Sequence, residues 1–566
     1  MKGSDLIALK IKKLGIKDVP VFQGGAIMNI IDSIGNMKGL NYYCPYHEQS
    51  LAMNIDGYSR IKGFGVGCVT SGPGATNLIT GVCCAFYDSI PCLFFTGQVG
   101  QFHIKKNKLH RQRGFQETDV RELFSSITKF SYQIKSVDEI EYIIDKAVYI
   151  AKNGRPGPVV LDVPFNVQTA KVDLKKQKKF IPPHETINKP KFLQITKNII
   201  NQIHRAKKPV IIAGGGITIS NLNKDFKKFI KKINVPFVTS WSSQDLTAFS
   251  DKLYFGSVGR HGNQSANEII DNSDLVVSLG YRYTPKSIHE NFGKKNKIKI
   301  ISIDIDPIEL NQTIVKITKK INMDLKIFFK ILKKIKFKKL ERNSWMKFCK
   351  KSKLEKFTNN LPDPSKKNLV NPYLFFDKFS DLTKKDSILI TDAGANLCWC
   401  MLSYRIKSNQ KLISAWGNSP MGYSIAAGIG ACYANPNKQI ISSIGDGSLM
   451  INLQDLQFLK HHSEVNLKII IFDNETLGNT KLGTQDLFNG RVYANDRKNG
   501  YFPPDIYRLV KAFKIRYFHL DKDLDINKKV KQFLSTNKTA ILHVKVSSEH
   551  NVIDHTKDHL QSVYKF

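Results

Sequence analysis

Cysteine and long apolar runs are scarce in this chain. Nine cysteines occur among 566 residues. That number is odd and too small for a disulfide scaffold, and Cys398 and Cys400 have no second pair at a zinc-like spacing. We expect the cysteines to be small buried residues kept reduced. No apolar run approaches the ~20 residues of a membrane-spanning helix, and the first residues lack the basic start, apolar middle and cleavage site of a signal peptide. The sequence therefore predicts a cytoplasmic protein that does not enter a membrane.

Acidic residues are few relative to basic ones. The chain has 48 Asp and Glu against 86 Lys and Arg, a formal net charge of +38. Such a field would attract nucleic acid or anionic surfaces. The lysines, however, are spread along the chain and gather in apparent linkers, and aromatic residues are not interleaved with them as a stacking platform would require. We therefore expect a solvated lysine-rich surface and no nucleic-acid partner, with a field that favours anionic small molecules.

Apolar segments of strand length alternate with helical patterns in three regions of the chain. This alternation is typical of parallel sheets with helices on both faces. Segments 171–191 and 347–371, rich in lysine and interrupted by proline, are expected to be linkers. The sequence thus predicts an α/β protein of three doubly wound domains, at 1–170, 190–345 and 370–566. The expected strands are 19–22, 65–70, 92–96, 159–163, 210–213, 236–239, 275–279, 298–303, 387–391, 439–444, 467–472 and 539–546.

A Gly-Asp-Gly-Ser turn at 445–448 directly follows the expected strand 439–444. A helical pattern at 451–459 and a second strand come next, and that strand ends shortly before Asn474. Asp446 and Asn474 would therefore emerge from neighbouring parallel strands at the carboxyl edge of one sheet, where such sheets bind ligands. Taken alone, the turn could equally be an ordinary tight turn after a strand. The second polar pair, one crossover later, favours a binding site.

The residue types at this edge suit a hard cation. A carboxylate from Asp446, an amide oxygen from Asn474 and the backbone carbonyl of Thr476 match the ligands that Mg²⁺ prefers, and diphosphate oxygens and water would complete an octahedron. Glycines let the backbone approach phosphates closely, and the amino terminus of a helix adds the positive end of the helix dipole. The sequence predicts a magnesium and diphosphate site, with the phosphates held by Gly445, Gly447 and Ser448.

This segment resembles the GDG…NN signature of thiamine-diphosphate enzymes, with Asp473-Asn474 as the closing pair. The rest of the chain resembles one branch of them, the acetolactate (acetohydroxyacid) synthase large subunits, over nearly its whole length. The resemblance implies two thiamine-diphosphate-binding-fold domains that flank a central Rossmann-like domain. Each block is only a loop motif, but together and in order they are specific. They are Gly24-Gly25-Ala26, His47-Glu48-Gln49, Asp56-Gly57-Tyr58-Ser59-Arg60, the TSGPGATN run at 70–77, Asp88-Ser89-Ile90-Pro91, the FQETD run at 115–119 and the GRPGP run at 154–158.

The resemblance makes Glu48 the central catalytic residue. A carboxylate beside the aminopyrimidine ring of thiamine favours the imino tautomer, whose nitrogen removes the proton from the thiazolium carbon. A Glu beside a His on a helix is by itself most often a surface charge, so the surrounding blocks carry this assignment. Phe115 and Gln116 would line the substrate end of the site. Ile451 would hold the cofactor bent, although a place in the core suits it equally well. The remaining implied contacts of thiamine diphosphate are Gly25, Met421 and Gly422.

The central region carries segments that resemble those lying along a flavin in the same family. A glycine triplet follows an expected strand there and opens toward a helix, an arrangement able to hold phosphate, although such triplets are also common in turns. The resemblance implies bound FAD without a net redox role in the main reaction; the alternative is a vestigial domain with an empty crevice. The implied FAD contacts are Arg155, Gly214, Gly215, Gly216, Gly259, His261, Gly262, Gly280, Arg282, Asp304 and Asp306.

The sequence departs from the family after the metal-binding strand. Gly483 stands where the family has a tryptophan that shapes the acceptor pocket, and Asn479 stands where it has a methionine. Loss of a large aromatic side chain would enlarge that pocket and remove an apolar wall. A wider pocket would suit a bulkier acceptor, so a related flavoenzyme that transfers the two-carbon unit to a nucleotide-linked keto sugar is the alternative.

The expected reaction is decarboxylation of pyruvate and transfer of its two-carbon unit to a second 2-keto acid. The products would be acetolactate or acetohydroxybutyrate, for valine and isoleucine synthesis. The resemblance also implies a homodimer or homotetramer with sites at the subunit interface, and a small regulatory subunit. Two alternative functions belong to other functional classes. One is a thiamine-dependent oxidase or simple decarboxylase, and the other is a non-catalytic anion-binding protein on an inherited scaffold.

Overall fold

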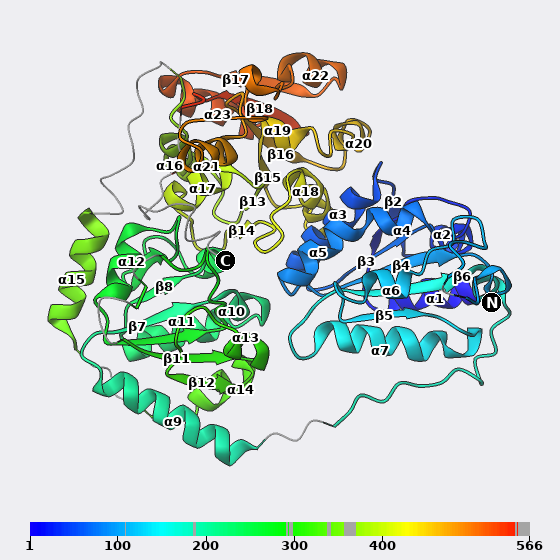
Figure 1. Ribbon diagram of the computed structural model, residues 1–566, viewed down its shortest axis with the longest axis horizontal. Coiled ribbons are helices and arrows are strands. Elements are labelled where there is room, and N and C mark those ends of the chain that lie inside the picture. Colours follow the sequence, from blue (N-terminus) through cyan, green and yellow to red (C-terminus); the bar gives the residue numbers. More distant parts are fainter. Residues whose placement is uncertain are drawn as a thin grey trace.

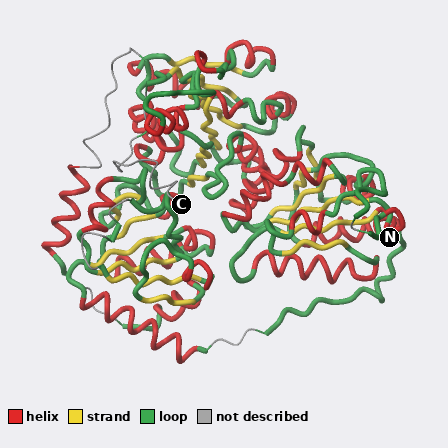
Figure 2. Tube along the Cα trace, viewed as in Figure 1, coloured by secondary structure: helices red, strands yellow, loops and turns green. Residues whose placement is uncertain are grey.

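The computed structural model describes residues 1–107, 109–184, 188–289, 292–293, 298–336, 341–355, 369–549 and 552. Its strands form three parallel sheets of four or more strands, one in each third of the chain (Figure 1). Figure 2 shows helices on both sides of the strands in each region. Among the described residues, no helix combines the length and the apolar character needed to cross a bilayer.

The N-terminal sheet has the strand order β3-β4-β6-β5. Side chains alternate between its faces: Phe95 points to the core formed with α1, α2 and α7, and Phe94 points to the core formed with α3, α5 and α6. A separate parallel pair, β1 and β2, joins this sheet through a bridge between Val21 and Cys68. The elements are α1 (Gly3–Lys13), β1 (Asp18–Pro20), α2 (Met28–Asn36), β2 (Asn41–Tyr43), α3 (Glu48–Lys62), β3 (Gly65–Val69), α4 (Pro73–Asn77), α5 (Ile79–Tyr87), β4 (Cys92–Gln98), α6 (Val120–Phe124), β5 (Phe130–Gln133), α7 (Ile140–Lys152), β6 (Val159–Pro164) and α8 (Phe165–Thr169).

The central sheet has the order β12-β11-β10-β7-β8-β9. Ile211 and Ile212 of β7 face opposite cores, so this sheet too is covered on both sides. Its elements are α9 (Lys189–Arg205), β7 (Pro209–Ala213), α10 (Gly215–Ile219), α11 (Asn223–Ile233), β8 (Phe237–Thr239), β9 (Tyr254–Ser257), α12 (Gln264–Asp271), β10 (Leu275–Leu279), β11 (Lys299–Asp304), α13 (Pro307–Asn311), β12 (Lys319–Asn322), α14 (Leu325–Leu332) and α15 (Asn343–Lys353).

The C-terminal sheet has the order β14-β13-β15-β16-β18-β17. Ile469 and Ile471 of β16 pack under α18, whereas Ile470 and Phe472 pack on the opposite face with α16, α17 and α23. The elements are α16 (Pro372–Leu382), β13 (Ile388–Thr391), α17 (Ala395–Ser403), β14 (Lys411–Ile413), α18 (Tyr423–Ala434), β15 (Ile440–Gly445), α19 (Asp446–Leu449), α20 (Asp455–His461), β16 (Leu467–Asp473), α21 (Gly478–Leu487), α22 (Ile506–Ala512), β17 (Arg516–Leu520), α23 (Ile526–Leu534) and β18 (Ala540–Lys545).

The N-terminal and C-terminal regions meet where α3 crosses α18 (Figure 1). Two glycines permit this close crossing. A Cβ atom on Gly57 would lie 2.2 Å from the carbonyl oxygen of Ala427, and one on Gly430 would lie 1.9 Å from that of Asn54. Helix α3 is therefore buried along most of its length, including its polar residues. The crossing fixes how the two regions lie relative to each other.

Each expected strand is present, with its ends shifted by at most two residues. Four expectations need correction. The linker predicted at 171–191 overlaps helix α9, which begins at Lys189, and Cys44 is exposed although the cysteines were expected to be buried. The linker predicted at 347–371 begins inside the helix α15, because the lysines there are exposed while Trp345 and Cys349 pack in the core; residues 356–368 lie outside the described part. The helix predicted at 451–459 is shorter, since residues 451–454 form turns and α20 begins at Asp455.

Candidate active site

A cavity of about 120 Å³ lies at the carboxyl ends of β13, β15 and β16. We call it the C-terminal cavity. The predicted metal and diphosphate residues gather here because the chain turns from a strand into a helix at each of these ends. The predicted residues that line it are Met421, Gly445, Asp446, Gly447, Ser448, Asn474 and Thr476.

Two glycines of this cavity present bare backbone to open space. A Cβ atom on Gly394 or on Gly445 would meet no other atom within 4 Å. Gly394 also has a φ of +102°, which side chains rarely adopt. Backbone that borders open space at the start of a helix is what close approach of a phosphate requires. The cavity therefore fits a diphosphate group.

Asp446 carries the charge that this cavity offers to a cation. Its side chain is buried, its Oδ1 accepts a hydrogen bond from the Gly447 N–H at 2.7 Å, and its Oδ2 accepts one from the Glu475 N–H at 2.9 Å. Burial, and then the negative charge of Asp473, raise the pKa of Asp446. A bound cation would compensate both effects.

Asp473 differs from Asp446 because two side chains already contact its carboxylate. Its Oδ2 accepts hydrogen bonds from His543 Nε2 at 2.8 Å and from Lys545 Nζ at 3.0 Å. Burial alone would raise the pKa of Asp473, but these two partners lower it below its usual value. The described residues contain no cluster of three or more His, Cys, Asp or Glu able to hold a metal. The donor set of one carboxylate, one amide and one carbonyl suits a Mg²⁺ ion that keeps positions for ligand oxygens.

The residues predicted to hold the pyrimidine ring adjoin this cavity. Gly422 has a φ of +84°, and a Cβ atom there would lie 2.8 Å from the Cβ atom of Ile451. Asn452 Nδ2 donates to the Gly422 carbonyl at 2.9 Å, and the buried carboxylate of Asp392 accepts from the Gly422 N–H at 3.0 Å. Ile451 is 48% exposed, so the alternative that it belongs to the core is wrong.

A second, larger cavity of about 580 Å³ belongs to the N-terminal domain. We call it the N-terminal cavity; the predicted Gly25, Phe115 and Gln116 line it. Gln116 has a φ of +60°, and the side chain of Phe115 is 84% exposed. The loop that carries them is held by Glu117, whose Oε1 accepts from the Lys105 N–H and whose Oε2 accepts from the N–H groups of Arg113 and Gly114, at 2.8, 2.8 and 3.1 Å.

Glu48 is the first residue of α3, and its carboxylate is buried. Glu48 Oε2 accepts a hydrogen bond from Asn77 Nδ2 at 2.9 Å, and a Cβ atom on Gly74 would lie 3.5 Å from Glu48 Oε1. The ordinary alternative, a surface charge, is therefore wrong. His47 is the N-cap of the helix, since its Nδ1 accepts from the Gln49 N–H at 3.0 Å.

The two cavities share no lining residue among the described residues. The N-terminal cavity is lined by residues between 25 and 166, and the C-terminal cavity by residues between 393 and 480. The amino end of α3 nevertheless reaches the C-terminal domain of the same chain, because Gln49 Nε2 donates to Asn452 Oδ1 at 3.2 Å.

Sequence reasoning missed part of each cavity. Asp392, Ala393 and Gly394 follow strand β13 as Asp446 and Gly447 follow β15, a signal that the sequence contained. The N-terminal cavity draws side chains from the end of β4, the start of α8 and the segments between 99 and 116, which no single motif connects. The lining residues not predicted include Ala393, Gly394, Ala395, Asn396 and Leu477 in the C-terminal cavity, and Ser71, Gln98, Phe102, His103, Arg113 and Phe165 in the N-terminal cavity.

The glycines predicted to hold FAD are packed against protein atoms. A Cβ atom on Gly214 would lie 1.9 Å from the Gly280 carbonyl oxygen, and one on Gly216 would lie 2.9 Å from the Gly280 Cα. Added Cβ atoms on Gly215, Gly259 and Gly262 would meet Ser242 Oγ, Lys286 O and Ser257 O at 2.7, 2.8 and 2.4 Å. Close packing thus accounts for the absence of a side chain at these positions, although Gly215 and Gly216 are still partly exposed.

The charged residues predicted for FAD lie together at the border between the N-terminal and central domains. Arg155 forms ion pairs with Asp306 and Glu309, each at 2.8 Å, and Arg282 pairs with Glu309 at 2.9 Å. Burial raises the pKa of Asp304 to about 6. The His261 ring lies 6.2 Å from that of Trp241. These side chains form a polar network between domains, and FAD binding stays a prediction that the family resemblance alone carries.

Comparisons with known proteins match this architecture. The chain matches the thiamine pyrophosphate enzyme N-terminal TPP binding domain at residues 1–123, the central domain at 196–332 and the C-terminal TPP binding domain at 392–544. Acetolactate synthase large subunits of Lactococcus lactis and Buchnera aphidicola are 31% and 30% identical to it, over 97% and 98% of this chain and 93% and 94% of theirs. Acetolactate synthase 1, chloroplastic, of Zea mays is 28% identical over 98% of this chain and 86% of its own. The chain is therefore a member of the thiamine pyrophosphate enzymes and, within them, of the acetolactate synthase large subunit family.

Proposed function

We propose that this chain is a thiamine-diphosphate-dependent acetolactate synthase, which decarboxylates pyruvate and transfers the two-carbon unit to a second 2-keto acid. The observation that carries the proposal is the C-terminal cavity, where bare glycine backbone and the buried carboxylate of Asp446 meet at the ends of three parallel strands. When bound, thiamine diphosphate would supply the carbanion that cleaves the keto acid.

Each predicted residue has a role in this proposal. Asp446, Asn474 and Thr476 would hold Mg²⁺, and the turn 445–448 would hold the diphosphate. Met421, Gly422 and Ile451 would support the pyrimidine ring. Glu48 would hold a proton against that ring; its burial and its single side-chain donor, Asn77, leave one carboxylate oxygen for this purpose among the described contacts. Phe115 and Gln116 would contact the substrates, and Gly25, which lines the same cavity, would contact thiamine diphosphate.

Product analysis tests the reaction. The purified chain would be incubated with thiamine diphosphate, Mg²⁺ and pyruvate, with and without 2-oxobutyrate. We expect acetolactate, and acetohydroxybutyrate when 2-oxobutyrate is present. Acetaldehyde or acetate as the main product would instead identify a decarboxylase or an oxidase. Transfer to a nucleotide-linked keto sugar is not favoured, because the similar proteins are acetolactate synthases.

We further propose a homodimer whose sites combine Glu48 of one copy with the C-terminal cavity of the other. Glu48 does not line the C-terminal cavity of its own chain among the described residues, which supports this assembly. Co-expression of a Glu48→Gln chain with an Asp446→Asn chain tests it. With shared sites, a mixed dimer keeps one intact site, and statistical pairing restores about a quarter of wild-type activity. With both residues of a site on one chain, no mixed dimer has an intact site and activity is not restored.

Three finer predictions remain part of this proposal. FAD would bind in the central domain, and flavin absorbance of the purified chain tests this. A small regulatory subunit would bind, as the term large subunit in the relatives' names suggests; co-purification from the native host tests this. The chain would act in the cytoplasm, which cell fractionation tests.

A further inference from the structure

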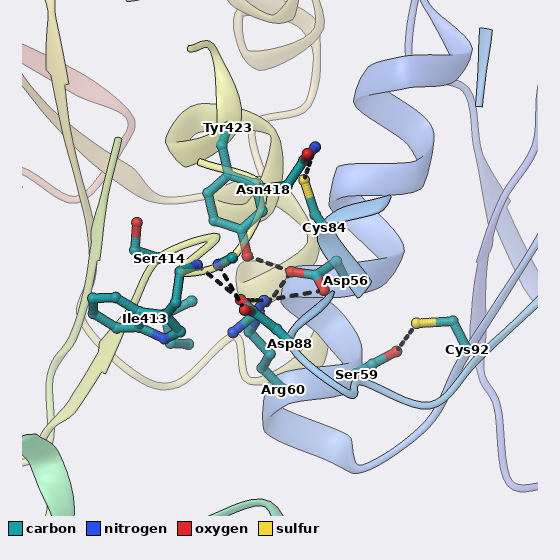
Figure 3. A network of polar contacts seen from close by, with 12 residues as sticks. Asp56, Ser59, Arg60, Cys84, Asp88, Cys92, Ile413, Ser414, Asn418 and Tyr423 are labelled. Atoms are coloured by element: carbon teal, nitrogen blue, oxygen red, sulfur yellow. Dashed lines mark hydrogen bonds and ion pairs between the residues drawn. The ribbon is translucent and has the colours of Figure 1, made fainter. Parts of the chain in front are cut away.

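Two sequence blocks of the N-terminal domain have no role in the site described above. They are Asp56-Gly57-Tyr58-Ser59-Arg60 and Asp88-Ser89-Ile90-Pro91. The structure brings their charged side chains together in one buried cluster (Figure 3). Arg60 Nε contacts Asp56 Oδ2 at 2.7 Å, and Arg60 Nη2 contacts Asp88 Oδ2 at 2.7 Å. The cluster lies on the face of the N-terminal domain that meets the C-terminal domain.

The cluster binds a loop of the C-terminal domain at both of its ends. Asp88 Oδ2 and Oδ1 accept hydrogen bonds from the backbone N–H groups of Trp416 and Gly417, each at 2.8 Å. At the other end, the Tyr423 hydroxyl donates to Asp56. Arg60 links the two carboxylates and thus the two ends of the loop. We call residues 416–423 the clamped loop.

The clamped loop depends on this support. Ser419 and Gly422 have φ values of +49° and +84°, so its backbone is held in left-handed conformations. A Cβ atom on Gly417 would lie 2.7 Å from the Tyr87 Cβ, which shows how closely the two domains approach. The Asn418 side chain adds a hydrogen bond to the Thr80 carbonyl at 3.1 Å.

The cluster in turn depends on the loop. Its two carboxylates pair with a single guanidinium, so the buried cluster carries one net negative charge. The two N–H groups and the Tyr423 hydroxyl are the donors that satisfy it. Because a buried carboxylate without partners is costly, the cluster and the loop stabilise each other.

We propose that Asp56, Arg60 and Asp88 are positioning residues for the cofactor. They hold the clamped loop so that Met421 and Gly422, which the loop carries, face the pyrimidine ring. This inference rests on the proposed function. It separates two halves of cofactor binding. The diphosphate would be held by residues 445–448, which the cluster does not contact among the described residues, and the ring by the loop, of which only Met421 also lines the C-terminal cavity.

Calorimetric titration of the full-length protein tests this separation, with thiamine diphosphate as one probe and inorganic pyrophosphate as the other, both with Mg²⁺. Asp88→Asn removes one charge and turns a donor toward a backbone N–H group. We expect about a tenfold loss of affinity for thiamine diphosphate, the equivalent of one charged hydrogen bond, and a change of less than about twofold for pyrophosphate. Tyr423→Phe removes one donor without a change of charge. It should also weaken thiamine diphosphate binding relative to pyrophosphate binding, but by a smaller factor than Asp88→Asn.

Asp271→Asn serves as the matched control. Asp271 is a buried carboxylate of the central domain that contacts His289 and lies away from both cavities. This variant should leave the affinities for both probes unchanged. Equal losses for both probes in Asp88→Asn, or no loss in either variant of the cluster, would overturn the inference. A wild-type protein that binds pyrophosphate but not thiamine diphosphate would instead overturn the proposed function.

Discussion

Substitution of Glu117 tests whether its carboxylate holds the loop that lines the N-terminal cavity. Its carboxylate accepts three backbone N–H groups, from Lys105, Arg113 and Gly114. In Glu117→Gln, one oxygen becomes an amide nitrogen, so at least one of these groups loses its acceptor. A hydrogen bond to a charged group contributes about 1.5–3 kcal/mol, and the two remaining bonds become weaker. We therefore expect the loop to lose about 2–4 kcal/mol of local stability.

Hydrogen exchange followed by mass spectrometry measures this loss. The amides of residues 109–117 should exchange faster by a factor of about 30 or more in Glu117→Gln, following the lower local stability. The KM for pyruvate should rise as well, because Phe115 and Gln116 lie in this loop. Glu139→Gln is a control in the same domain, since Glu139 also accepts a backbone N–H, from Lys135. Equal exchange of 109–117 in the two variants would refute the reasoning.

The pH dependence of the same contact has a definite sign. Burial would raise the pKa of Glu117, but the three backbone donors lower it below the ordinary value of 4.5. The folded state therefore favours the charged form. The stabilisation is present above pH 4.5 and is lost as the pH falls through the lowered pKa. Lower protection of 109–117, measured relative to the intrinsic exchange rate at each pH, should accordingly appear in the wild type upon acidification, and this effect should be much weaker in Glu117→Gln.

Three further substitutions test other parts of the structure. Gly445→Ala puts a methyl group into the open space of the C-terminal cavity; thiamine diphosphate affinity should fall by about tenfold at an unchanged melting temperature, and unchanged affinity would contradict the diphosphate assignment. Gly430→Ala forces a Cβ atom against the Asn54 carbonyl; denaturant titration should show a loss of about 1–3 kcal/mol, whereas wild-type stability would contradict the close crossing of α3 and α18. Gly483→Trp should raise the kcat/KM for 2-oxobutyrate relative to bulkier keto acceptors, and an unchanged ratio would contradict a widened pocket.

The sequence predicted central strands better than edge strands. All strands that were missed lie at the edge of a sheet or in the small β1–β2 pair. The strands β12 (Lys319–Asn322) and β17 (Arg516–Leu520) illustrate the reason, since most of their side chains are partly exposed. An edge strand is not covered like a central one, so it needs no continuous apolar run. The pattern that revealed the central strands is therefore absent from these.

The part of the site that could be predicted is the one whose polar residues directly follow adjacent strands. Asp446 and Asn474 follow adjacent strands, so topology alone brings them to one cavity. Arg113 lines the N-terminal cavity through a loop conformation that leaves no local pattern, and Gln98 does so from the last position of strand β4. The glycine triplet 214–216 shows a different limit. A glycine triplet after a strand has the same sequence whether its glycines face a phosphate or pack against protein backbone. Gly214 packs against the backbone of Gly280, at the end of another strand.

The most direct test of the account concerns Glu48 (Figure 1, amino end of α3). Glu48→Gln preserves the shape of the buried side chain but removes its ability to exchange a proton with the pyrimidine ring. We predict that kcat for acetolactate formation falls by a factor of about 10²–10⁴, while the dissociation constant of thiamine diphosphate with Mg²⁺ changes only a few-fold. A variant that turns over pyruvate at the wild-type rate would contradict the central claim that Glu48 activates the cofactor.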